Sequence, residues 1–213
     1  MEKESIDQIK QMKALVKDMN EVNKFIFWRD LICLSLIGWI SLFYTAFHFN
    51  IFLFLIGTYA LYKGTMLIHE VSHLSKKIPG YKLAYNLLLG YPNSYPAYIY
   101  DTHLFHHGKK TYGTIKDPEY AFIKEYNFVT LLRPLLTSFL LPIMQVFRFV
   151  LLPLITPLTS QNFKRTLYQK YSTLVFSTQY VRPIKNESKE LKMMMTQDLY
   201  CSLFKIFFLS LVY

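Results

Sequence analysis

The chain has little cysteine and little glycine, with 2 Cys and 7 Gly among 213 residues. Cys33 and Cys201 both stand in apolar segments, where a thiol acts most simply as a small hydrophobic group. The sequence therefore indicates no disulfide framework, and it lacks the cysteine ligands that structural zinc sites tend to use. Histidine is also absent after His107.

Charged residues are missing from two long stretches in the first third of the chain. Residues 31–47 carry no charge; after a three-residue link, a second uncharged run covers 51–62 and continues beyond Lys63 to His69. Each stretch approaches the ~20 residues with which a helix crosses a bilayer. A cleaved signal peptide fits less well, because a charged segment precedes the first run and no small-residue cleavage site follows it. The pattern predicts an all-α, multi-pass integral membrane protein with a transmembrane helical hairpin.

The distribution of charge indicates an orientation. The net charge is +10, and from residue 129 onward ten Lys and Arg stand against three Asp and Glu, so seven of the ten net charges lie there. By the positive-inside tendency, this region and the N-terminus should be cytoplasmic. A basic balance in such a chain favours anionic lipid head groups over nucleic acid as the partner.

Two regions follow from these patterns. Residues 1–24 hold five Lys and five acidic residues, with apolar residues at helical spacing. They predict an amphipathic helix that lies either on a membrane or on the rest of the chain. Residues 25–213 should form the membrane domain. Within it, 134–147 is short for a span and proline-interrupted, so we expect an interfacial or partly inserted helix pair.

The stretch LIHEVSH, residues 67–73, carries the first chemical signal. A helix would place His69, Glu70 and His73 on one side, as in zinc metalloproteases. If that helix begins near Ile51, His69 lies ~18 residues and thus ~27 Å along it, close to the thickness of the hydrocarbon layer. The motif should therefore emerge at the cytoplasmic surface.

A second histidine cluster follows in DTHLFHHGKKTYGTIKDPEY. His103, His106 and His107 stand at i, i+3 and i+4, so a helix would place them on one face. Five of the six histidines thus fall within 39 residues. Such a gathering has no evident packing benefit without a metal. Imidazole suits iron as well as zinc, and five ligands suggest two ions.

At these residues the sequence resembles the membrane fatty acid desaturases, a superfamily shared with membrane hydroxylases. The resemblance rests on the hairpin, on the box His69-x-x-x-His73, and on His103-x-x-His106-His107 some 30 residues later. HHGKKTYGTIKDPEY, FRFVLLPLITPL and TQYVRPI extend it, so that it covers roughly residues 25–213.

The resemblance implies an O2-dependent enzyme with two iron ions that removes two hydrogens from a fatty acyl lipid, with electrons from a ferredoxin or cytochrome-type donor. All five clustered histidines would be iron ligands. Glu70 would orient one of them. Asp101 would do the same or cap the following helix, which is the simpler reading. Asp117 and Glu119 would be structural or surface residues, or alternatively support the metal.

Three alternatives remain. A di-iron membrane hydroxylase would use the same histidines and differ only in its product. An intramembrane zinc metalloprotease would use Glu70 as general base, but the apolar run 127–161 offers no acidic ligand and three histidines would be idle. Zinc also lacks the redox chemistry that cleavage of an unactivated C–H bond requires. A non-enzymatic metal-binding or regulatory remnant is the third.

The family pattern includes a third histidine cluster after a further pair of spans. This chain has no histidine after His107, and its last apolar run, which begins at Leu199, is too short to cross. We therefore expect a truncated desaturase that does not desaturate lipid by itself and binds metal loosely.

Overall fold

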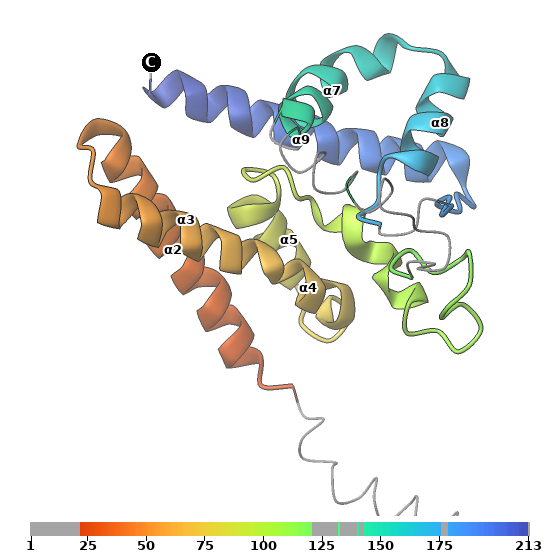
Figure 1. Cartoon of the computed structure of the whole chain (residues 1–213), viewed down its shortest axis with the longest axis horizontal. Coiled ribbons are helices and arrows are strands. Elements are labelled where there is room, and N and C mark those ends of the chain that lie inside the picture. The colour runs from red at the N-terminus through yellow and green to blue at the C-terminus, as the bar shows by residue number, and fades with distance from the viewer. Residues whose placement is uncertain (1–21, 121–131, 133–139, 141–142, 176–178, 213) are drawn as a thin grey trace, which may run out of the picture.

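The computed structural model describes residues 22–120, 132, 140, 143–175 and 179–212. These residues form helices and connecting turns, and no β-strand occurs among them (Figure 1). In chain order the helices are α2 (Lys24–Phe47), α3 (Ile51–Met66), α4 (Ile68–Leu74), α5 (Tyr81–Tyr85), the π-helix η2 (Asn86–Gly90), the 3-10 helix η3 (Ala97–Phe105), the π-helix η5 (Phe147–Leu151), α7 (Leu152–Ile155), the 3-10 helix η6 (Thr156–Leu158), α8 (Gln161–Lys170) and α9 (Glu187–Val212).

The two uncharged stretches form an antiparallel hairpin of α2 and α3, as predicted (Figure 1). Asn23 and Asn50 cap these helices, because each side chain accepts hydrogen bonds from N–H groups of the first turn. The segments Lys24–Phe47 and Ile51–Leu74 are both long and apolar enough to cross a membrane. The chain is thus a helical membrane protein.

The second span passes directly into the first histidine motif. The Leu67 N–H donates to the Gly64 carbonyl at 3.1 Å, which tightens the backbone for one turn between α3 and α4. α4 then continues for seven residues and carries His69 and His73. The motif therefore lies at the end of the hairpin that is far from its turn at His48.

Prolines divide the apolar segment that begins at Ile143. Pro153 stands in the first turn of α7 and Pro157 in that of η6, so this segment passes from π-helix to α-helix to 3-10 helix. The final apolar run is part of a longer element than the sequence suggests. α9 begins at Glu187, in a stretch expected to be a charged cytoplasmic segment, and continues to Val212.

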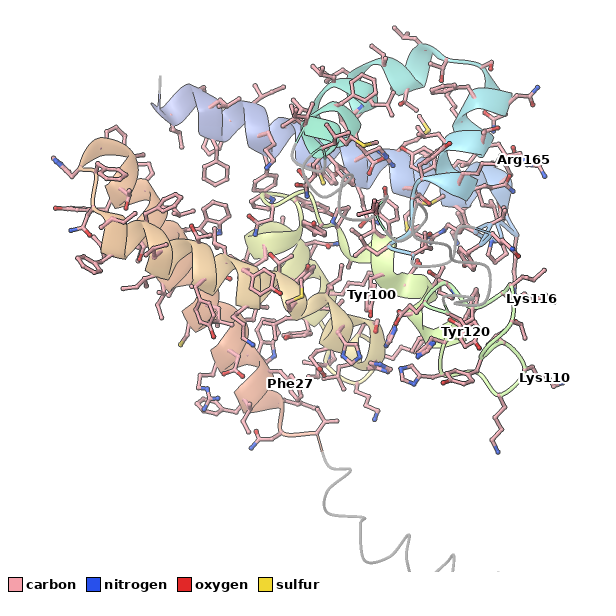
Figure 2. The ribbon with its side chains drawn as sticks, viewed as in Figure 1. Phe27, Tyr100, Lys110, Lys116, Tyr120 and Arg165 are labelled. Carbon is pink, nitrogen blue, oxygen red and sulfur yellow. The ribbon has the colours of Figure 1, made fainter. Side chains whose placement is uncertain are left out.

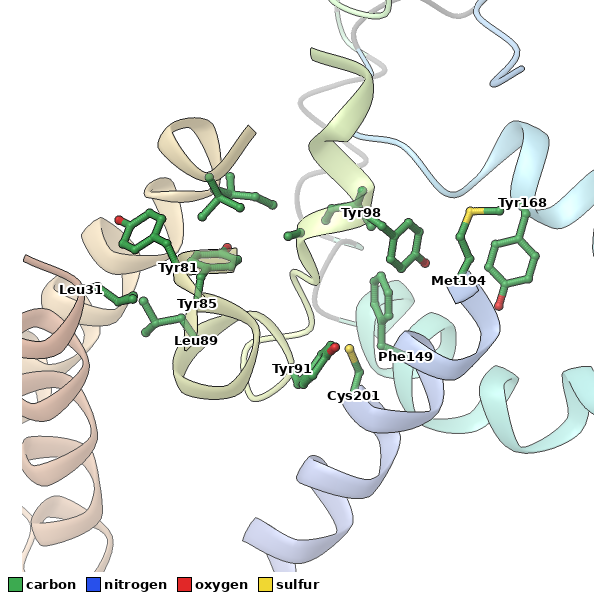
Figure 3. Close-up of a cluster of buried hydrophobic side chains, with 14 of the residues drawn as sticks. Leu31, Tyr81, Tyr85, Leu89, Tyr91, Tyr98, Phe149, Tyr168, Met194 and Cys201 are labelled. Atoms are coloured by element: carbon green, nitrogen blue, oxygen red, sulfur yellow. The ribbon is translucent and has the colours of Figure 1, made fainter. Parts of the chain in front are cut away.

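Buried aromatic side chains belong to one core that includes residues of the hairpin, of η3 and of α9. Tyr81, Tyr85, Tyr98 and Tyr168 are fully buried. Figure 3 shows Tyr81 and Tyr85 beside the hairpin, and Tyr98 and Tyr168 near Met194 of α9. Tyr98 and Tyr168 both donate to the carboxylate of Asp198 on α9. This shared core fixes η3, which carries part of the second histidine cluster, against α9.

Two expectations lie outside the described residues. The predicted amphipathic helix falls almost entirely on residues 1–21, and most of the stretch 134–147, where we expect the interfacial pair, falls on residues 134–139 and 141–142.

Candidate metal centre

Two histidines of the site come from α4. His69 and His73 are one helical turn apart, and their ring centroids are 4.8 Å apart. The apolar neighbours Val71 and Leu74 are buried, so the opposite face of this short helix is anchored in the core. The two imidazoles are thereby held on the face that looks toward η3.

The second cluster has a different backbone from the expected α-helix. His103 is in the 3-10 helix η3, and His106 and His107 follow its end. His103 is only 4% exposed, and its Nε2 lies 2.9 Å from Nε2 of His107 and 3.1 Å from Nε2 of His73. One nitrogen from each of four histidines, His69, His73, His103 and His107, lies within 4.8 Å of the others.

His106 is set apart from this four-histidine cluster. Its ring centroid is 6.2 Å from that of His103 and 5.6 Å from that of His107, and its ring also contacts Tyr112. The helical spacing alone predicts all three histidines of the second box on one face. The 3-10 helix ends at Phe105, so the backbone that carries His106 and His107 does not continue the helix that carries His103.

The nitrogen spacing fits a metal better than hydrogen bonding alone. Glu119 accepts from Nδ1 of His103, so Nε2 of this ring has one lone pair. Two other Nε2 atoms approach it at about 3 Å, and one lone pair cannot serve both well. With metal–nitrogen bonds of about 2.1 Å, adjacent ligands of one ion are also about 3 Å apart.

Three of the histidines have a carboxylate next to their Nδ1 atom. Glu70 Oε1 is 3.1 Å from Nδ1 of His69, which is the geometry that an orienting role requires, although both side chains are partly exposed. Asp117 and Glu119, which the sequence favours as structural or surface residues, lie directly against His106 and His103. The acidic pair in KDPEY was the available signal for this arrangement.

Asp101 does not contact any of these rings through its hydrogen bonds. Its Oδ2 accepts from Arg182 at 2.7 Å, and Arg182 also donates to the Tyr98 carbonyl. Its role is therefore to tie η3 to the segment before α9. Neither predicted role, histidine orientation or helix capping, matches these contacts.

Burial and hydrogen bonding shift the pKa values of His103, Asp117 and Tyr100. Burial lowers the pKa of His103, against the opposing effect of Glu119, and a neutral imidazole is the form that binds metal. Burial disfavours a charged Asp117. Hydrogen bonds from the Gly113 and Glu119 amides and from His106 outweigh that effect, and the pKa of Asp117 is lowered. Burial also raises the pKa of Tyr100 to about 12.

Tyr100 is a further residue of the site that the sequence does not single out. Its ring stacks on His103 with centroids 4.6 Å apart and planes 12° apart. In Figure 2, Tyr100 and Tyr120 lie toward the end of the molecule opposite the α2–α3 turn. The stacked ring restricts the plane of the most buried histidine.

The 3-10 helix η3, which carries His103, also lines an apolar groove of about 700 Å³. Ile99 of η3 lines it, together with Phe149, Leu152 and Leu167 from the C-terminal half. Four residues of a 3-10 helix span about 8 Å, which is the rise from Ile99 to His103. The same helix therefore contributes to a hydrophobic groove and to the histidine cluster.

Comparison with known proteins agrees with this site. A ceramide hydroxylase from Caulobacter vibrioides (strain NA1000 / CB15N) is 29% identical over 184 residues, which cover 83% of this chain and 52% of that protein. The chain thus spans about half the length of this curated relative. No solved structure matches this chain. The profile of the fatty acid desaturases matches residues 45–182, which include the whole histidine cluster. The chain belongs to the fatty acid desaturase family, whose members are membrane oxidoreductases with a di-iron centre.

Proposed function

We propose that this chain carries part of the active site of an O2-dependent membrane oxidoreductase that oxidises the hydrocarbon chain of a lipid. The observation that carries the proposal is the four-histidine cluster at the end of an apolar hairpin, in a chain of this family. Bound iron would supply the dioxygen chemistry needed to attack an unactivated C–H bond.

The histidines have distinct parts in this proposal. His69, His73, His103 and His107 would be ligands of one ion or be shared between two. His106 would serve the second ion, because Asp117 occupies its Nδ1 and leaves its Nε2 available. Glu70 would orient His69 through the contact at Nδ1.

The lipid would approach from the bilayer. Apolar side chains of the hairpin are widely exposed, and the groove beside η3 is lined mainly by apolar residues. The positive-inside tendency favours a cytoplasmic position for the histidines, where a ferredoxin or cytochrome-type donor could deliver electrons.

Two products are possible with the same histidines. Desaturation is the outcome suggested by the sequence motifs. Hydroxylation is the second candidate, because the similar protein from Caulobacter is named a ceramide hydroxylase. Mass spectrometry of host lipids, after expression of the reading frame that encodes the chain, separates them. A double bond lowers the mass by two hydrogens, whereas hydroxylation adds one oxygen.

Metal analysis tests the proposal independently of the product. For the protein encoded by the complete reading frame, we expect iron after purification from membranes and loss of most of it in His103→Ala, since His103 Nε2 lies beside two other potential ligands. His48→Ala is the matched control, because His48 stands in the hairpin turn and should leave the iron content unchanged. Stoichiometric zinc that His103→Ala does not alter would contradict the proposal.

A further inference from the structure

Two carboxylates on one short loop reach the Nδ1 atoms of two histidines. Glu119 Oε1 lies 2.5 Å from Nδ1 of His103, and these side chains are 15% and 4% exposed. Both oxygens of Asp117 lie within 3.1 Å of Nδ1 of His106, and Asp117 is completely buried. Each contact is on the side of the ring opposite Nε2.

These contacts determine which nitrogen carries the hydrogen. An ionised carboxylate can only accept, so the neutral imidazole facing it must hold its hydrogen on Nδ1. The lone pair is then on Nε2. For His103 this nitrogen lies beside Nε2 of His73 and of His107, where a shared ion would bind.

Asp117 also holds the loop in the shape that brings Glu119 to His103. Its Oδ2 accepts from the Gly113 N–H at 3.0 Å and its Oδ1 from the Glu119 N–H at 2.9 Å. Gly113 has a φ of 70°, a conformation that glycine adopts without strain. One buried carboxylate therefore closes the loop, contacts His106 and places the backbone of Glu119.

We propose that Glu119 and Asp117 are positioning residues, which hold His103 and His106 in the Nδ1–H tautomer with Nε2 free to bind metal. The inference deepens the proposed function and rests on it where metal is concerned. A carboxylate behind a histidine ligand raises ligand basicity as well as fixing the ring, so its loss should weaken binding.

The first test measures metal affinity. Fe²⁺ is titrated anaerobically into the purified protein in competition with a chelator, for wild type, Glu119→Ala, Glu119→Gln and Asp117→Asn. We expect about a 10–100-fold loss of affinity in Glu119→Ala. Glu119→Gln should recover part of it, because the amide oxygen can still accept from Nδ1. Asp117→Asn should weaken binding as well, since it disturbs both histidines.

Asp30→Asn is the control. Asp30 is on α2, and its partly exposed carboxylate pairs with Arg29. This variant should retain wild-type Fe²⁺ affinity. Thermal unfolding of each metal-free variant shows whether a loss of affinity reflects a loss of fold. Equal Fe²⁺ affinity in wild type and Glu119→Ala would overturn the positioning role while leaving the proposed function in place.

The second test reads the tautomer without any metal. Nitrogen-15 shifts of the imidazoles distinguish a protonated from an unprotonated ring nitrogen. We expect the Nδ1–H form of His103 in wild type and in Glu119→Gln, and a mixture of tautomers in Glu119→Ala. A wild type that binds no iron would overturn the proposed function, whereas an unchanged tautomer in Glu119→Ala would overturn the positioning role.

Discussion

The carboxylate of Asp198 is a buried charge that depends on three neighbouring side chains for its hydrogen bonds. It is fully buried and accepts hydrogen bonds from Arg148 at 2.7 Å and from Tyr168 at 2.6 Å, as well as from Tyr98. A buried ion pair contributes little net stability, because both charges lose hydration. Removal of one partner is costly, since the other charge is left buried without compensation.

Asp198→Asn should therefore destabilise the protein strongly. It leaves the guanidinium of Arg148 buried without a counter-charge, which typically costs about 3–5 kcal/mol. The free energy of unfolding in detergent, measured by denaturant titration, checks this value. Glu187→Gln on the same helix is the control, because its carboxylate contacts the exposed Gln161 at 3.5 Å and should contribute less than about 1 kcal/mol. Similar losses of unfolding free energy in both variants would show that Arg148 does not depend on Asp198 for its counter-charge.

Small residues allow α2 and α3 to pack closely. Ser35, Gly38 and Ser41 are buried on α2, and Gly57 and Ala60 are buried on α3. Helices in membranes associate mainly through such small residues, because lipid tails offer no hydrophobic driving force between them. A Cβ added at Gly38 would lie 2.6 Å from Cγ of Leu61, so the hairpin has no room for it.

Gly38→Ala should destabilise the hairpin, and the loss should depend on Leu61. Overpacking of this kind costs about 1–3 kcal/mol. In the double variant Gly38→Ala/Leu61→Ala, the added methyl group occupies part of the space that Leu61 vacates, so the combined loss should be smaller than the sum of the single losses. Denaturant titration in detergent measures all three variants. Ile37→Ala, at an exposed position on α2, is the control, and additive losses would contradict the predicted clash.

The sequence predicts some elements well and others poorly, for physical reasons. Uncharged runs of this length have few alternatives to a helix in a membrane, so α2 and α3 are predictable. Helical spacing also brings His69 and His73 together correctly. The end of the 3-10 helix η3 at Phe105, beyond which His106 lies outside the four-histidine cluster, is not encoded in that spacing.

Helical spacing places Glu70 beside His69, but it does not say which histidines Asp117 and Glu119 contact. Glu119 contacts His103 from a loop in which Gly113 has a positive φ and Asp117 binds the Gly113 and Glu119 amides, and no periodic pattern encodes such a loop. Asp101 pairs with Arg182, 81 residues later, and contacts at that distance depend on how whole helices pack. Nearness in sequence therefore identifies the histidine that Glu70 contacts, but it gives the wrong role for Asp101.

In the whole molecule, the histidines and the hairpin turn lie at opposite ends. α9 runs back so that its C-terminal end lies on the side of that turn (Figure 1), and Trp39 stacks on Phe208 with centroids 5.1 Å apart. Lys24 and Arg29 stand near the start of α2, whereas the turn at residues 48–50 has no Lys or Arg. By the positive-inside tendency, the turn should be outside and the metal centre at the cytoplasmic face.

Labelling from the two sides of the membrane should therefore distinguish the turn from the histidine loop. A helix of 24 residues is about 36 Å long, enough to carry the chain across the hydrocarbon layer. Single cysteines at the exposed positions His48 and Lys109, in a background with Cys33 and Cys201 replaced by Ala, are treated with an impermeant thiol reagent in intact cells and after permeabilisation. His48→Cys should react in intact cells, and Lys109→Cys only after permeabilisation. The reverse result would keep the hairpin but invert its orientation, and reaction of both positions from the same side would show that the hairpin does not cross the membrane.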